Sequence, residues 1–109
     1  MKRIKKAISW LKLELGLGLD LKIRLEDDIP VEIKNGIVYV IGGKAPWLLL
    51  LRCPCGCGET IHLNLLKEAN PCWGYRIEKN TISVKPSVWR TTGCKSHFII
   101  RGSQVQWVK

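Results

Sequence analysis

The alternation of apolar and polar residues divides the chain into a helix-like segment and a longer strand-like region. Between residues 3 and 15, apolar side chains recur at helical spacing: Ile4, Ile8, Leu11 and Leu15. Gly16 and Gly18 end this pattern, and from residue 19 onward the apolar period becomes two, which is typical of strands. We therefore predict a basic amphipathic helical arm at residues 1–18 and a single β domain at residues 19–109.

The strand-like region predicts roughly eight or nine short strands separated by turn residues. The expected strands are residues 19–25, 31–33, 37–41, 47–52, 60–65, 75–78, 81–85, 97–101 and 104–108. Asn35-Gly36 predicts a hairpin between the second and third of these segments, and residues 86–93 are expected to form a loop. The fold class is therefore mainly β, a small antiparallel sheet or barrel with one N-terminal helix.

The cysteines are the most specific chemical signal in the chain. Five are present, and Cys53, Cys55 and Cys57 alternate within five residues, which suits a metal better than a disulfide framework. Glycines between and after them let the backbone turn its N–H groups toward sulfur. Cys94 follows a glycine in another predicted turn and would complete a tetrahedral zinc site of four thiolates.

The ligand set of this site stays open from spacing alone. His97 lies three residues after Cys94, so a site of three cysteines and one histidine is an alternative, and one knuckle cysteine could be a bystander. Cys72 is expected to be a free thiol. His62 alternates with apolar neighbours and is expected to be exposed.

The net charge of +9 favours an acidic partner such as nucleic acid, an anionic membrane or an acidic protein surface. The basic residues are concentrated in residues 1–24, so the arm is the expected contact for such a partner. No apolar stretch approaches the ~20 residues that span a membrane. No signal peptide is apparent either, and the clustered cysteines suit a reduced, cytoplasmic protein.

A second group of residues has the chemistry of nucleophilic catalysis. Ser87 follows a proline in the C-terminal half, and His97 follows the predicted metal turn. A serine nucleophile needs a histidine base within ~3 Å of its hydroxyl, a distance that spacing alone does not fix. Glu59 and Glu78 are candidates for a third catalytic residue by elimination only.

Several motifs resemble a bacterial family of small zinc-containing domains, formerly of unknown function. The matching pieces are Ile29-Pro30, Gly36–Tyr39, Cys53–Gly58, Ile61–Leu65, Trp73, Val84–Ser87, Cys94–Phe98 and Trp107. The match spans roughly three quarters of the chain. Members of this family are encoded beside ubiquitin-like conjugation genes and in phage or defence contexts, and they are predicted to be peptidases of ubiquitin-like proteins.

The resemblance implies a peptidase that matures a ubiquitin-like protein or removes it from its conjugates. Ser87 would then be the nucleophile and His97 the base, and Cys53, Cys55, Cys57 and Cys94 would bind zinc. Two other functions remain open. One is a metallopeptidase with Glu59 as base, which several thiolates on zinc disfavour. The other is a non-catalytic zinc ribbon that binds nucleic acid or a protein partner.

Overall fold

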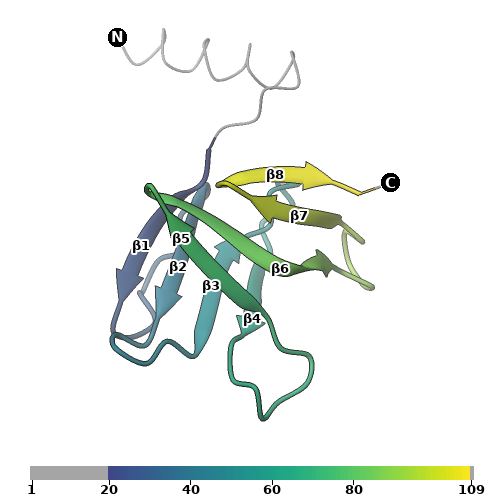
Figure 1. The fold of residues 1–109 in the computed structure, drawn as a ribbon. Helices are drawn as coiled ribbons and strands as arrows, with labels where there is room; N and C mark the ends of the chain where they lie inside the picture. Colours follow the sequence, from purple (N-terminus) through teal and green to yellow (C-terminus); the bar gives the residue numbers. More distant parts are fainter. Residues whose placement is uncertain (1–19, 109) are drawn as a thin grey trace, which may run out of the picture.

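The computed structural model describes residues 20–108, which form two four-stranded sheets (Figure 1). The first sheet contains β1 (Lys22–Glu26), β2 (Ile37–Ile41), β3 (Leu48–Arg52) and β4 (Thr60–Asn64). The second contains β5 (Gly74–Glu78), β6 (Thr81–Trp89), β7 (His97–Arg101) and β8 (Gln104–Trp107). In each sheet the strands lie side by side in chain order. The mainly β prediction is therefore confirmed, as two sheets in place of one sheet or a barrel.

The main hydrophobic core lies between the two sheets. Its buried members from the first sheet and its flanks are Leu21, Val38, Val40, Leu49, Leu51, Cys53, Ile61 and Leu63. The second sheet contributes Ile82, Val84, Val88, Phe98 and Ile100. These side chains follow the period of two that strands require, since alternate residues of one strand face the same side. The packing of the sheets thus comes directly from the alternation in the sequence.

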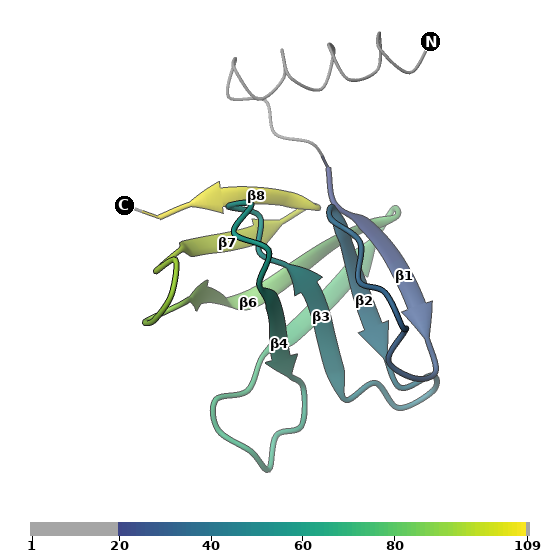
Figure 2. The ribbon, with the colours of Figure 1, turned by 180° about the vertical axis from the view of Figure 1, so that it is seen from behind.

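The outer face of the first sheet carries a second apolar cluster, which explains one wrong prediction. Residues 31–33 do not form a strand, and the expected hairpin at Asn35-Gly36 is absent from the described residues. Ile33 instead packs against Tyr39, Ile41, Leu48 and Leu50 on this face. As a result β1 and β2 are parallel, and the connection between them runs over the outer face of the first sheet (Figure 2).

Most other predicted strands are confirmed, with one informative difference in β6. Residues 86–93 were expected to be a loop, but β6 continues through Trp89. Val84 pairs with Ile100 and Val88 pairs with Phe98, so three residues of β6 lie opposite Ile99 alone. Such a bulge accommodates a proline inside a strand and turns the side chains next to it.

Hydrogen bonds close the second sheet at the turn between β7 and β8. Ser103 is buried there, and its hydroxyl accepts a bond from the backbone N–H of Ile82 at 2.9 Å. Its carbonyl accepts a bond from the N–H of Leu21 at 2.6 Å, which ties this turn to the start of β1. The structure at this end is held by protein groups alone.

Two further predictions concern the N-terminal helix and membrane-spanning segments. The predicted helix at residues 1–18 lies outside the described residues. No helix capable of crossing a membrane occurs in the part of the chain that the structure describes.

Candidate functional site

Four cysteines meet where a turn of the first sheet faces a turn of the second. Cys53 follows β3 directly, and Cys55 and Cys57 lie in the knuckle that connects β3 to β4. Cys94 lies in the connection from β6 to β7. The knuckle is closed by the N–H of Cys53, which donates to the carbonyl of Glu59 at 2.8 Å. Gly56 and Gly58 have positive φ, a backbone conformation that glycine adopts without strain.

The sulfur atoms of Cys53, Cys55, Cys57 and Cys94 all lie within 4.8 Å of one another. A tetrahedral site with metal–sulfur bonds of ~2.3 Å requires sulfur–sulfur distances of about 3.8 Å. The sulfurs of Cys53 and Cys94 are 3.7 Å apart, and those of Cys53 and Cys55 are 3.3 Å apart. The group therefore fits one metal ion bound by four thiolates, and His97 does not belong to it.

Ser96 contacts the cysteine group from the second sheet. Its hydroxyl lies 3.2 Å from the sulfur of Cys94 and 3.8 Å from that of Cys53. The hydrogen bond with Ser96 lowers the pKa of the Cys94 thiol to about 6, whereas burial raises the pKa of the Cys53 thiol to about 12. Cys94 therefore offers a thiolate at neutral pH, and a bound metal would displace the proton of Cys53.

Ser87 and His97 lie side by side on β6 and β7. The Oγ atom of Ser87 is 2.9 Å from Nε2 of His97, which is hydrogen-bonding distance. Ser87 lies in the bulge of β6, and His97 is the first residue of β7. The bulge thus has a chemical consequence, since it carries the serine hydroxyl to the histidine ring.

Two tryptophans hold this pair. The ring of Trp89 stacks on the imidazole of His97, with ring centroids 5.1 Å apart and an angle of 16° between the planes. Trp89 and His97 are also paired across the two strands, which places both side chains on the same face. The indole N–H of Trp73 donates to the carbonyl of Ser87 at 3.4 Å and fixes the backbone there.

The turn that contains Cys94 lies in the same connection that leads to His97. Cys94 precedes His97 by three residues in the segment that leads from β6 into β7. The N–H of Arg90 donates to the carbonyl of Ser96 at 2.8 Å and closes this connection below the two side chains. Whatever fixes Cys94 therefore also fixes the start of β7 and the position of the imidazole.

The other candidate residues lie elsewhere. Glu59 approaches Arg90, with 4.0 Å between its Oε2 and Nη2 of the arginine, and Glu78 forms an ion pair with Arg76. Within residues 20–108, no carboxylate forms a hydrogen bond or ion pair with His97. Cys72 lies in the connection from β4 to β5, outside the cysteine group, and His62 is exposed as expected.

Sequence reasoning missed Trp89 and Ser96. The signal for Trp89 was present in Val88-Trp89, where a buried and an exposed residue alternate as in a strand. The proline at position 86 suggested a loop and hid that signal. Ser96 carries no pattern of its own, because its role depends on Cys53, which lies far away in the sequence.

Comparison with known proteins identifies one family. The model of a family described as "Bacterial ubiquitination-like system serine protease (BubE)" matches residues 25–108. The matched segment includes every described strand except the first residues of β1, together with the four clustered cysteines, Ser87 and His97. No curated protein and no solved structure matches the chain.

Proposed function

The chain belongs to the BubE family of bacterial ubiquitination-like system serine proteases, and on that premise we propose that Ser87 is its nucleophile. The proposed reaction is hydrolysis of the bond that follows the C-terminal residue of a ubiquitin-like protein. That bond joins the protein either to a C-terminal extension or to a target. His97 is the proposed base, and zinc is the proposed metal of the four cysteines.

One observation carries this proposal, the 2.9 Å distance between Oγ of Ser87 and Nε2 of His97. In the proposed reaction Oγ attacks the substrate carbonyl while Nε2 takes the hydroxyl proton. The imidazolium then gives that proton to the leaving amine, and an acyl ester forms on Ser87. Water attacks the ester with His97 again as base, which releases the acid and restores the serine.

The stacked ring of Trp89 supports the histidine in this reaction. In a serine triad a carboxylate orients the imidazole and stabilises its charged form. No such carboxylate contacts His97 within the described residues. A ring stacked at 5.1 Å restricts rotation of the imidazole, and the face of an indole attracts a cation. We assign Trp89 the role of a positioning residue.

Zinc in this proposal has a structural role. Four thiolates complete a tetrahedron and leave no position for a catalytic water. The cysteines Cys53, Cys55, Cys57 and Cys94 supply that number within one compact group. A route through metal-bound water with Glu59 as base would need an open position, so we rank it below the serine route.

The decisive experiment combines mutation with trapping of the acyl intermediate. Purified protein would be incubated with a ubiquitin-like protein that carries a C-terminal extension, and with the same protein ending in an electrophile. We expect Ser87→Ala to abolish both cleavage and covalent capture, while metal content and thermal stability stay normal. Thr91→Ala, an exposed substitution in the β6–β7 connection, is the matched control and should keep full activity.

His97→Ala separates the two roles considered for this residue. As the base, its loss should abolish cleavage and leave the metal content unchanged. As a fourth metal ligand, its loss should release the metal. Full activity of Ser87→Ala combined with loss of activity on chelation would refute the serine route. Absence of any cleavage together with salt-dependent binding of nucleic acid would favour the non-catalytic zinc ribbon.

A further inference from the structure

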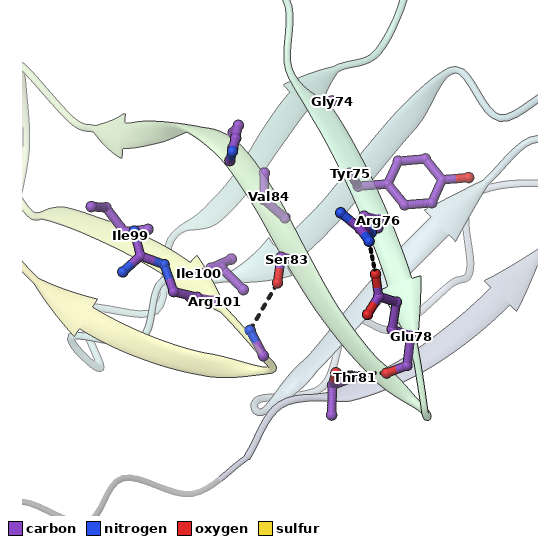
Figure 3. A pocket seen from close by; sticks show the side chains of 12 residues that line it. Gly74, Tyr75, Arg76, Glu78, Thr81, Ser83, Val84, Ile99, Ile100 and Arg101 are labelled. Carbon is purple, nitrogen blue, oxygen red and sulfur yellow. Dashed lines mark hydrogen bonds and ion pairs between the residues drawn. The ribbon is translucent and has the colours of Figure 1, made fainter.

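An open groove lies on the outer face of the second sheet, beside the Ser87–His97 pair. It has a volume of about 660 Å³ and is formed by β5, β6 and β7 (Figure 3). Among the residues that line it are Arg76, Ser83, Lys85, Ile99 and Arg101. Neither Ser87 nor His97 belongs to the lining, so the groove is a neighbouring feature that the proposed chemistry does not use.

The two strands β6 and β7, which help to form the groove, also hold the Ser87–His97 pair. Alternate residues of a strand face the same side, so His97, Ile99 and Arg101 follow one another along the outer face of β7. On β6, Lys85 lies two residues before Ser87, in the same bulge and opposite Ile99. The groove therefore begins at Lys85 and Ile99, two residues from Ser87 and His97, and runs toward Arg101, which lies roughly 13 Å from His97 at ~3.3 Å per residue.

The charge of the groove is positive where it leaves the catalytic pair. Arg76 forms an exposed ion pair with Glu78, so these two charges largely cancel. Lys85 and Arg101 are exposed, and neither forms an ion pair with another described residue. Ile99 lies opposite Lys85 and between His97 and Arg101 on β7, and it is half-buried and presents an apolar surface. Read away from the Ser87–His97 pair, an occupant that matches these residues has an apolar residue and then an acidic one.

We propose that this groove binds the extended C-terminal tail of the protein substrate, with an acidic residue about four positions before the scissile bond. The spacing follows from the strand, since an extended peptide and β7 both advance ~3.3 Å per residue. A tail residue two positions before the bond would lie over Ile99, and one four positions before it would reach Arg101. The positive charge of Lys85 would also attract the acidic residue.

The acyl side of the substrate is the part that the groove must recognise. This step rests on the proposed function. An enzyme that removes one protein from various targets meets many leaving amines but a constant acyl segment. Contacts that raise specificity therefore belong on the acyl side, where every substrate offers the same residues.

Two peptidyl coumarin amides test the proposal, because the scissile bond is fixed in such substrates. They would differ only in Glu or Gln at the fourth residue before that bond. Single exposed charge pairs are worth ~0.2–1 kcal/mol, so we expect kcat/KM to be roughly 1.5- to fivefold higher for the Glu peptide. The preference should fade near 1 M salt, where the screening length falls to ~3 Å.

Charge variants make the assignment specific to Arg101. Arg101→Gln should remove most of the preference, and Arg101→Glu should reverse it in favour of a peptide with Lys at the same position. Lys44→Gln, in the exposed connection between β2 and β3 of the other sheet, is the matched control and should keep the preference. All four proteins should react equally fast with a small, uncharged fluorophosphonate at Ser87.

The fluorophosphonate reaction distinguishes the two levels of failure. Labelling of Ser87 with equal cleavage of the Glu and Gln peptides would overturn the groove proposal alone, as would labelling without cleavage of either peptide. No labelling and no cleavage would overturn the proposed function and this inference with it. Binding of a fluorescent single-stranded oligonucleotide that is lost in Arg101→Gln would assign the groove to nucleic acid and also overturn the proposal.

Discussion

The two ends of the second sheet are both joined to the first sheet, but by different means. At the β7–β8 turn the buried Ser103 bonds the backbone of Ile82 and Leu21 at distances below 3 Å. At the β6–β7 connection the link is the group of thiols around Cys94, which needs a metal ion to become a set of bonds. One end is thus complete as soon as the chain folds. The other end would be completed by a metal ion, which the four thiols could bind, and the proposed catalytic pair lies there.

The largest expected effect is loss of the metal from the second of these ends. Cys57→Ser, or chelation of the wild-type protein, should lower peptidase activity by a factor of 100 or more, because the connection that carries His97 is no longer fixed. Elemental analysis and activity assays before and after addition of zinc would measure this. Cys72→Ser is the control and should change neither quantity. Wild-type protein without bound metal that keeps full activity would contradict the comparison.

The opposite end should show the reverse pattern. Ser103→Ala removes the acceptor for a buried N–H of Ile82, and such an unpaired group costs about 1–3 kcal/mol. We expect the free energy of unfolding to fall by that amount while activity at 25 °C and metal content stay normal. Denaturant unfolding would measure the change. Ser87→Ala is the mirror control, since it should lose activity and keep stability. Loss of activity in folded Ser103→Ala would show that the ends are coupled.

A smaller effect is expected from the ring that supports the histidine. Trp89→Ala should lower kcat by about twofold to tenfold, because stacked aromatic pairs contribute ~0.5–1.5 kcal/mol. Trp89 is 65% exposed, so the unfolding temperature should change little. Trp89→Phe should restore most of the activity. Full activity of Trp89→Ala would contradict the positioning role.

The smallest effect concerns the ion pair that joins the two cysteine-bearing turns. Glu59 and Arg90 approach to 4.0 Å, and the glutamate side chain is 61% exposed. Exposed pairs of this kind contribute little, so Glu59→Gln should change the unfolding free energy by less than about 0.5 kcal/mol. Activity should stay within a factor of two. A large loss of activity would instead revive Glu59 as the base of a metal-dependent route.

The parts of this molecule that were predictable from the sequence are those set by local patterns. The strand from Leu48 to Arg52, the β5–β6 hairpin and the cysteine knuckle depend on neighbouring residues, and each was found as expected. The connection at residues 31–33 was not predictable, because Ile33 packs on residues that a local pattern cannot place beside it. The packing of Ile33 outweighs the local preference of Asn35-Gly36 for a hairpin.

In the candidate site too, features set by local sequence patterns were predictable and those set by tertiary contacts were not. The gathering of the knuckle cysteines was predictable because they are adjacent in the sequence, although their contact with Cys94 spans 41 positions. The nearness of Ser87 to His97 could not be derived from spacing, since it depends on a bulge of β6 that the sequence suggested was a loop. For that pair, the family resemblance supplied the expectation.

The bond between Leu21 and Ser103 determines where anything joined to the N-terminal side of the described residues is attached. That point lies at the far end of β7 from His97, about four residue steps or roughly 13 Å along the strand. A fused protein, an affinity tag or a membrane-targeting segment at this junction would not have to pass over the Ser87 hydroxyl. A fusion on the N-terminal side of Leu21 is therefore a practical way to tether the chain beside a chosen substrate.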